Sequence, residues 1–158
     1  QFNQDCNNWN ISKATTLTSM FEDCPFNKSL SKWDLSSVTT TSSMFGLNTA
    51  FNQDVSMWNV SSLSSAVSMF TGATAFNQSL ALWDVTALSS NQLTFFGGGS
   101  GLSTANYDAT LIGWAAQNVN SGVSINFGSS QYTAGGEAAA ARATLVTKGW
   151  TITDGGTA

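Results

Sequence analysis

The chain contains no histidine, and this absence removes the residue that most often serves as a general base or a metal ligand. Charged residues make up 9% of its 158 residues, against about 25% in an ordinary soluble domain. Only five residues are lysine or arginine, too few to neutralise many phosphates or to hold the chain on an anionic membrane. We therefore expect no nucleic-acid partner, and solubility must come from Ser, Thr, Asn, Gln and Gly.

Cysteines and long apolar runs are also scarce. Two cysteines cannot form a four-cysteine zinc site; Cys6 and Cys24 either form one disulfide in an oxidising compartment or pack as small buried thiols. No apolar run approaches the ~18 residues of a membrane span, so we expect no direct membrane insertion. The chain opens inside a repeat unit without a visible signal peptide, which suggests a fragment of a longer protein.

A repeat of 24 or 25 residues organises the first part of the chain. Phe-Asn recurs four times, and a Trp follows seven residues after each Phe. Asn or Asp, an aliphatic residue and a hydroxyl residue come directly after each Trp. Three units then carry Met-Phe, and the fourth carries Thr94-Phe95 at that position. The repeated aromatic pairs are Phe2 and Trp9, Phe26 and Trp33, Phe51 and Trp58, and Phe76 and Trp83.

Each unit combines a strand pattern with a helix pattern. In the second unit, Trp33 and Leu35 are two residues apart and would face one side of a strand. Ser36 stands where a helix N-cap belongs, and Met44-Phe45 would lie in a short helix or 3₁₀ turn. One such unit cannot bury its own apolar face, so stacked units must place Trp over Trp and Phe over Phe. The sequence therefore predicts an α/β repeat, a leucine-rich-repeat-like right-handed solenoid with a short-stranded parallel sheet.

The repeat pattern ends at the glycine-rich stretch 97–101, which predicts a turn. After it, the sequence predicts helices at 107–117 and 137–146 and strands at 123–127 and 150–153. Two longer helix–strand coils would thus continue and close the same solenoid. The expected division is 1–96 for the four repeat units and 97–158 for the glycine-rich turn and the C-terminal capping coils.

Several segments carry a family resemblance: Phe51-Asn-Gln-Asp-Val-Ser-Met-Trp-Asn-Val-Ser-Ser-Leu, the following Ser68-Met-Phe-Thr-Gly-Ala, and the tail from Asn106 to Gly155. They resemble the BspA-like bacterial surface-protein repeat family and its C-terminal closing segment. The resemblance implies extracellular exposure, adhesion or partner binding, and no catalysis. It brings no catalytic residue, cofactor or metal to this chain. The departures from the family pattern are Thr94 in place of Met, and Thr41 and Asn91 at positions that are usually apolar.

The repeated Asn, Trp and Phe residues are better explained by structural roles than by ligand binding or modification. The asparagines of the four Phe-Asn pairs are better explained as an internal ladder that satisfies turn backbone groups than as glycosylation sites. The Trp and Phe rings are expected in the core rather than on a carbohydrate-stacking platform. No catalytic, cofactor-binding or metal-binding residue is therefore predicted.

Function is expected on the outward-facing strand residues, because solenoids use such a face as an extended binding surface. Met57 and Leu82 would form an exposed apolar spot there, and such spots often mark contacts. The candidate binding face comprises Asn8, Asn10, Lys32, Asp34, Met57, Asn59, Leu82, Asp84, Ser124, Asn126, Thr151 and Thr153.

Three functions compete for such a chain. The first is a non-catalytic module at the cell surface or outside the cell that mediates adhesion or protein–protein interaction. The second is a structural spacer or stalk that self-associates end to end. The third is a module that binds a glycan or a solid surface such as ice through rows of Thr, Ser and Asn. The expected partner is accordingly a protein or glycan on another surface.

Overall fold

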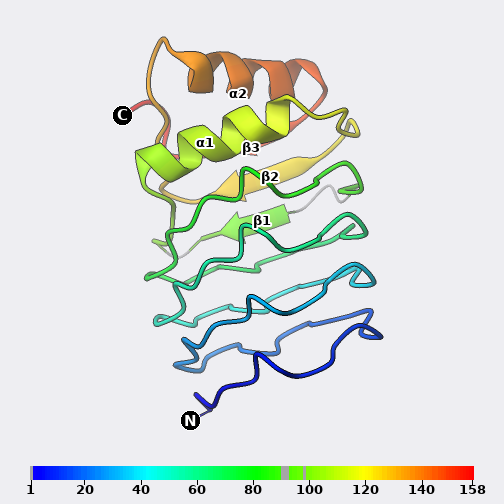
Figure 1. The fold of residues 1–158 in the computed structure, drawn as a ribbon. Helices are drawn as coiled ribbons and strands as arrows, with labels where there is room; N and C mark the ends of the chain where they lie inside the picture. The colour runs from blue at the N-terminus through cyan, green and yellow to red at the C-terminus, as the bar shows by residue number, and fades with distance from the viewer. Residues whose placement is uncertain (1, 90–92, 98) are drawn as a thin grey trace.

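The computed structural model describes residues 2–89, 93–97 and 99–158, and it is an α/β structure with two helices and a three-stranded parallel sheet. The strands lie in the order β1-β2-β3, and the helices connect them (Figure 1). In chain order the elements are β1 (Leu93–Phe96), α1 (Thr104–Ala115), β2 (Ser124–Phe127), α2 (Glu137–Thr147) and β3 (Thr151–Thr153).

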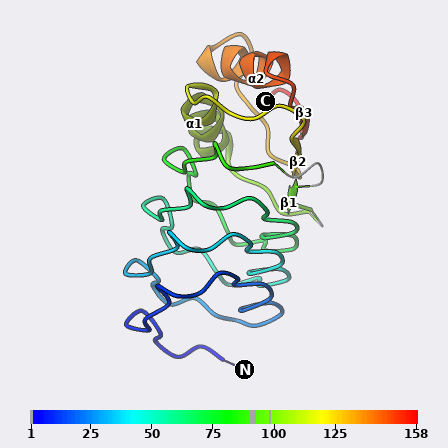
Figure 2. The same ribbon diagram turned by 90° about the vertical axis from the view of Figure 1, so that its right-hand side faces the viewer.

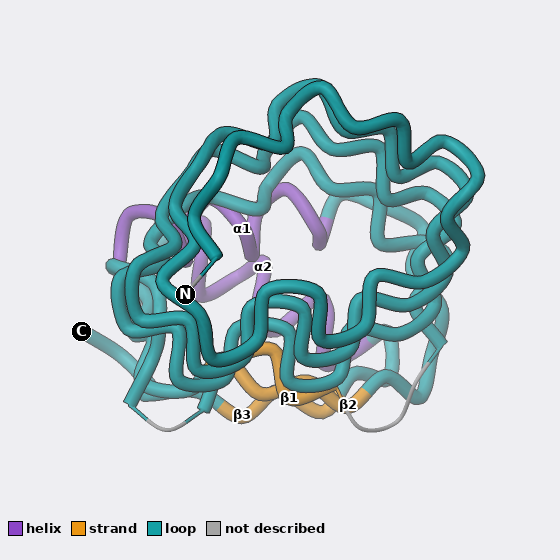
Figure 3. Tube along the Cα trace, turned by 90° about the horizontal axis from the view of Figure 1, so that it is seen from below, coloured by secondary structure: helices purple, strands orange, loops and turns teal. Residues whose placement is uncertain are grey.

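Before the helices, the chain winds in stacked coils that each begin at one of the repeated phenylalanines (Figure 1). We number them coil 1 (2–25), coil 2 (26–50), coil 3 (51–75) and coil 4 (76–102). Viewed along the stack, the coils lie over one another and the three strands gather along one side (Figure 3). Residues 24 or 25 positions apart therefore meet across each coil–coil boundary.

Two columns of phenylalanine rings fill the centre of the stack. In one column, Phe51 stacks on Phe26 at 6.2 Å and on Phe76 at 6.0 Å between ring centroids. In the other, Phe45 lies 5.6 Å from Phe21 and 5.7 Å from Phe70. The columns touch within each coil, as between Phe45 and Phe51 at 3.8 Å. The predicted stacking of Phe on Phe is confirmed, and offset stacking of this kind stabilises beyond the area it buries.

The tryptophans form a third column that is also tied by hydrogen bonds. The indole N–H of Trp33 donates to the Cys6 carbonyl at 3.0 Å, and those of Trp58 and Trp83 donate to the equivalent carbonyls one coil earlier at 3.1 and 2.9 Å. The predicted interior column is confirmed for these three residues, which are at most 4% exposed. It is wrong for Trp9, which is 50% exposed because no described residue covers the first coil.

The parallel pairing lies in the Met-Phe part of each unit, not in the Trp part as predicted. Thr16, Thr40 and Ser65 form parallel bridges from coil to coil, and β1 continues the same line in coil 4. The segment 30–35 forms no strand, although burial alternates over 32–35 as in a strand. The reason is that the N–H groups of Trp33 and Val38 donate three residues back in turns, to Leu30 and Leu35. They are thus not available for a ladder.

Around Met44-Phe45 the chain forms no helix but consecutive turns, in which the N–H groups of Met44 and Gly46 donate three residues back, so only the turn alternative of the prediction holds. Ser19, Ser43 and Ser68 have φ between 52° and 57°, in the left-handed region, which interrupts any helix. These turns point alternate N–H groups toward the following coil, so that Leu17, Ser19 and Phe21 donate to the carbonyls of Thr40, Ser42 and Met44. The Met-Phe segment therefore alternates between bonds to the next coil and bonds three residues back, in place of the continuous i to i−4 bonds of an α-helix.

The fourth unit is aligned one residue later than the sequence indicated. Phe70 donates its backbone N–H to the Phe95 carbonyl, just as Phe45 donates to Met69. Phe95 consequently takes the methionine position, and Phe96 stacks on Phe70 at 5.5 Å. The alignment of Thr94-Phe95 with Met-Phe is thus wrong, because this unit has one extra residue before its phenylalanine pair, and β1 is irregular between Thr94 and Phe96.

The two helix–strand coils at the C-terminal end are confirmed, with helix and strand bounds within three residues of those predicted. α1 lies on the Trp part of coil 4: its Trp114 indole donates to the Leu80 carbonyl, and its Thr110 hydroxyl accepts the Leu80 N–H. A Cβ at Gly113 would lie 2.3 Å from the Ala81 carbonyl oxygen, so this close approach requires glycine. α2 then packs on α1 at the end of the stack (Figure 2).

Two variants of tryptophans in the column test the bond from indole to carbonyl between coils. We expect Trp58→Phe to lower the free energy of unfolding by about 1–3 kcal/mol, because it removes a buried hydrogen bond and ring volume. Trp9→Phe should lower it by less than about 0.5 kcal/mol, since its indole is half exposed and has no acceptor among the described residues. Urea unfolding measures both values, and losses of equal size would contradict the coil-to-coil bond.

Candidate binding surface

The residue after each repeated Trp closes a tight turn. Its side-chain oxygen accepts the backbone N–H two residues ahead, at distances of 2.9–3.2 Å. The predicted helix N-cap at Ser36 is therefore wrong: the Ser36 N–H is itself bound by Asp34, and no helix follows. These Asn- or Asp-headed turns hold the outer edge of the Trp part of every coil. Their pairs are Asn10 with Ser12, Asp34 with Ser36, Asn59 with Ser61, and Asp84 with Thr86.

Hydrogen bonds in two turns headed by Asp lower the pKa of the Asp carboxylate. The Ser36 N–H and hydroxyl hold the pKa of Asp34 below its usual value. The hydroxyl and N–H of Ser56 do the same to the pKa of Asp54. Both groups therefore stay ionised as turn acceptors, and neither has the raised pKa of a general acid.

The Phe-Asn asparagines form the predicted ladder. The side-chain oxygen of Asn3 accepts the backbone N–H of Asn27 at 3.1 Å, and each later asparagine repeats the bond one coil further on. Asn77 ends the series by accepting the Ser103 N–H at 2.9 Å, just before α1. The ladder is confirmed, but it lies on the exposed surface and not inside the stack as expected.

The structure divides the predicted binding face between two sides of the molecule. One group lies on the Trp parts of coils 1–4, which we call the Trp side. The other group lies on β2 and β3, where Ser124 pairs with Thr151 and Asn126 with Thr153. A single face would require strands in the Trp parts, and the pairing runs through the Met-Phe parts instead. The Trp-side group comprises Asn8, Asn10, Lys32, Asp34, Met57, Asn59, Leu82 and Asp84.

The apolar spot on the Trp side is present. Met57 is 80% exposed and Leu82 is 68% exposed. Each precedes a buried Trp, and Trp58 and Trp83 are stacked at 6.4 Å, so Met57 and Leu82 sit in adjacent coils. One coil earlier, the Lys32 ammonium donates to the Asn8 side-chain oxygen at 2.8 Å. The spot is thus an apolar pair bordered by polar side chains.

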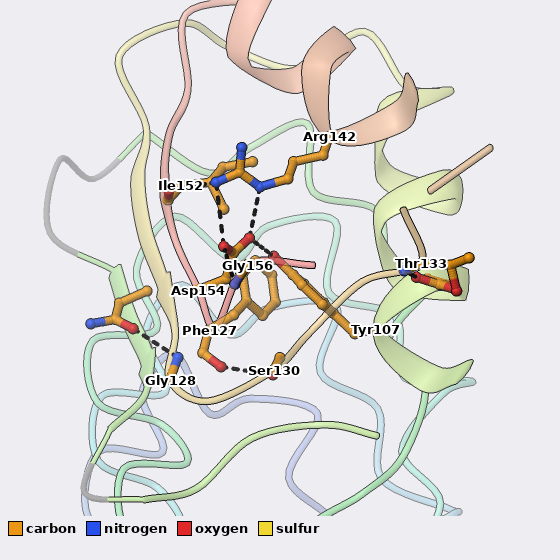
Figure 4. A network of polar contacts seen from close by, with 11 residues as sticks. Tyr107, Phe127, Gly128, Ser130, Thr133, Arg142, Ile152, Asp154 and Gly156 are labelled. Carbon is orange, nitrogen blue, oxygen red and sulfur yellow. Dashed lines mark hydrogen bonds and ion pairs between the residues drawn. The ribbon is translucent and has the colours of Figure 1, made fainter. Parts of the chain in front are cut away.

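The sequence did not single out the polar cluster that fastens the last coil (Figure 4). The Tyr107 hydroxyl and the Arg142 guanidinium both donate to one oxygen of Asp154, each at 2.7 Å. Arg142 also donates to the Ile152 carbonyl, and the Gly156 N–H donates to the other oxygen of Asp154. We call these residues the closing cluster. It joins α1, α2 and the end of β3, which are far apart in sequence, so no local pattern could reveal it.

Burial and charge set the protonation of the closing cluster. Burial raises the pKa of Tyr107 far above its ordinary value, and the hydrogen bond to Asp154 raises it further. The hydrogen bond to Asp154 also raises the pKa of Arg142. The cluster is therefore a neutral phenol and a guanidinium around one carboxylate. With Tyr107 fully buried and the Asp154 side chain 4% exposed, it is built to hold the chain together.

Cys6 and Cys24 are free thiols, and burial, followed by the charge of Asp5, raises the pKa of Cys6. The described residues contain no cluster of three or more potential metal ligands among Cys, Asp and Glu. Neither helix of the described chain is long and apolar enough to cross a membrane.

The closing cluster makes stability fall at alkaline pH. Because the pKa of Tyr107 is raised in the folded chain, its contribution is complete below about pH 10, the ordinary value for Tyr. Above it, the free energy of unfolding should fall by up to about 1.4 kcal/mol per pH unit. Urea unfolding between pH 8 and 11 should show a less steep decline for Tyr107→Phe than for Tyr132→Phe, and both should keep the part due to Cys6, whose pKa burial also raises. Identical pH profiles in the two variants would refute the assignment.

Comparison with known proteins gives one match. Residues 1–109, which include all the repeat coils and the start of α1, match a protein family described as "Mycoplasma protein of unknown function, DUF285". No curated protein and no solved structure matches the chain. The match covers more than half of the chain and coincides with the repeats that build the Phe and Trp columns. The chain therefore belongs to the DUF285 family.

Proposed function

We propose that the chain is a non-catalytic, extracellular or cell-surface repeat module that binds a protein on another surface through its Trp side. The observation that carries the proposal is the pair Met57 and Leu82, two large apolar side chains exposed in adjacent coils. Exposed apolar groups rimmed by polar ones are typical of protein contacts. A chain without histidine and with few charges is better suited to contact than to acid–base chemistry.

The proposal includes a finer description of the fold. We infer a right-handed solenoid of leucine-rich-repeat type, related to the BspA-like surface repeats. Its support is the hydrogen bonding between equivalent residues of successive coils and the family to which the repeats belong. Such a framework suits binding, because each coil contacts its neighbours and the outer side chains form a long continuous surface.

The Trp side has the properties that a contact surface needs. Its backbone is fixed by the Asn- or Asp-headed turns, so little conformational freedom is lost on binding. Lys32 is already held by Asn8 at one border of the apolar pair. Asn59 and Asp84 follow Met57 and Leu82 by two residues and are exposed, and each keeps hydrogen-bonding atoms beyond the one oxygen that closes its turn. We therefore expect affinity from the apolar pair and specificity from the rim.

A second candidate partner is a glycan, bound on what we call the sheet side, the surface of the Thr16, Thr40 and Ser65 bridges and of β1, β2 and β3. Two hydroxyls pair in each of the first two coils there, Thr16 with Thr18 at 2.9 Å and Thr40 with Ser42 at 3.1 Å. Thr151 and Thr153 on β3 add exposed hydroxyls at the far end of the same line of strands. Hydroxyl groups both donate and accept hydrogen bonds, as sugar recognition requires. Binding on a glycan array that Thr16→Val and Thr40→Val abolish would favour this candidate over a protein partner.

The protein-binding proposal is tested by a paired variant. Met57→Lys with Leu82→Lys should weaken retention on immobilised extracellular proteins and whole cells by about tenfold or more, because two apolar contacts are lost. The control is Leu47→Lys with Val146→Lys, which adds the same charge at apolar residues that are 56% and 45% exposed elsewhere. The control should bind as the unmodified chain does.

Two results would count against the proposal. Retention of the Met57→Lys, Leu82→Lys chain at the unmodified level would remove the Trp side as the site. Failure of the unmodified chain to be retained on any of these surfaces would remove the binding function itself. Circular dichroism of each variant establishes that the coils remain folded.

A further inference from the structure

The exposed apolar pair of the Trp side is continued onto α1. Gly113 of α1 lies against the backbone of Ala81, the residue before Leu82, so the helix crosses coil 4 beside the pair (Figure 1). Side chains two residues apart on a helix point to nearly opposite sides, so Ile112 faces outward where Trp114 faces the interior. Ile112 is accordingly 38% exposed, and Trp114 is fully buried. The resulting row of exposed apolar residues, which we call the apolar strip, comprises Met57, Leu82 and Ile112.

Carboxylates border the apolar strip without matching cations. Asp34 and Asp84 follow the repeated Trp in coils 2 and 4, and both are exposed. One oxygen of each closes its turn, and the other accepts no hydrogen bond within the described chain. Between Lys32 and Arg142 the sequence contains no Lys or Arg, and Lys32 itself is bound to Asn8 of coil 1. The two carboxylates, which we call the acidic edge, are therefore free to attract a cationic partner.

The spacing of the coils favours one backbone conformation for the partner. Hydrogen-bonded coils, like paired strands, follow one another at about 4.8 Å. One turn of an α-helix rises about 5.4 Å, so a helix laid along the stack offers about one side chain to each coil, at positions i, i+4 and i+7. An extended segment places the side chains of one face about 6.6 Å apart, so it is out of register within three coils. The apolar strip therefore fits a helix better than an extended peptide.

We propose that the Trp side binds an amphipathic α-helix of its protein partner, with an apolar stripe flanked by Lys or Arg; this inference rests on the proposed function. The helix lies along the stack, and its apolar residues at i, i+4 and i+7 contact the apolar strip. Two basic residues seven positions apart meet Asp34 and Asp84, since seven residues of helix and two coils each span about 10 Å. The apolar contacts supply affinity, and the ion pairs set the direction of the helix.

The described chain does not itself contain such a helix. α1 has no Lys or Arg, and the single Arg of α2, Arg142, is bound to Asp154 in the closing cluster. A second copy of the described chain therefore has no basic flank to place on the acidic edge. The helix is expected on a different protein.

The probe is a fluorescent alanine-based helical peptide that carries Leu at i, i+4 and i+7 and Arg at i+1 and i+8. One comparison peptide has Glu in place of both Arg, and another has a central Pro that breaks the helix. Binding to the whole chain is measured by fluorescence anisotropy at low and high salt.

The variant that tests the acidic edge is Asp34→Asn with Asp84→Asn. It removes both charges and keeps both turns, because Asn already heads the equivalent turns of coils 1 and 3. The matched control is Glu22→Gln with Asp23→Asn, which removes two exposed charges away from the Trp side.

The Arg peptide should bind about tenfold or more tightly than the Glu and Pro peptides. Asp34→Asn with Asp84→Asn should remove most of this advantage together with its dependence on salt, and the control variant should keep both. Ile112→Lys should weaken binding of the Arg peptide by about tenfold, because the helix then loses an apolar contact and meets a like charge.

Arg and Glu peptides of equal affinity would overturn the proposal, and so would Arg and Pro peptides of equal affinity. Unchanged affinity in Ile112→Lys would overturn the placement of the helix along the stack. Failure of the proposed function is a separate result. If Met57→Lys with Leu82→Lys prevents retention on cells while the Arg peptide does not bind, the Trp side remains a binding surface and the basic helix is wrong.

Discussion

A hydrogen bond from a tryptophan indole to a backbone carbonyl of the preceding coil is the interaction on which the structure depends. The Leu30 carbonyl shows its geometry: it accepts the backbone N–H of Trp33 at 3.0 Å and the indole N–H of Trp58 at 3.1 Å. One oxygen thus closes the turn of its own coil and anchors the next. Because the indole bond needs a neighbouring coil and a single coil cannot bury its aromatic side chains, one coil has no stable structure of its own. The same bond attaches both helical coils, through Trp114 and Trp150.

The sequence predicts those parts of the fold in which one residue type has one role in every unit. The Phe and Trp columns and the asparagine ladder belong here, since their positions are fixed by the spacing of the repeat. The two final helices are predicted separately, from the helical spacing of their own apolar residues. The assignment of strand to the Trp segment failed because alternating burial, as at Trp33 and Leu35, also arises in consecutive turns. The left-handed serines that direct N–H groups between coils are not distinguishable by composition from serines in a helical turn.

The candidate site could be predicted only where it depends on which residues are buried and not on which segments form strands. Exposure of Met57 and Leu82 follows from their place beside buried tryptophans, which does not depend on whether the segment is a strand. Grouping them with Thr151 and Thr153 did depend on it, and the structure separates the two groups. The closing cluster is a property of the whole stack. It joins residues of α1, α2 and the end of β3, and no repeat consensus contains these contacts.

Hydrogen bonding gives the stack of coils a direction. In the Met-Phe segments alternate N–H groups, such as those of Leu17, Ser19 and Phe21, donate to carbonyls of the following coil. The central claim is that indole–carbonyl bonds couple successive coils, and hydrogen exchange of the six indole protons in the unmodified chain tests it most directly. The account predicts that Trp9 exchanges at least about tenfold faster than Trp33, Trp58 and Trp83. Exchange of those three protons as fast as that of Trp9 would contradict it.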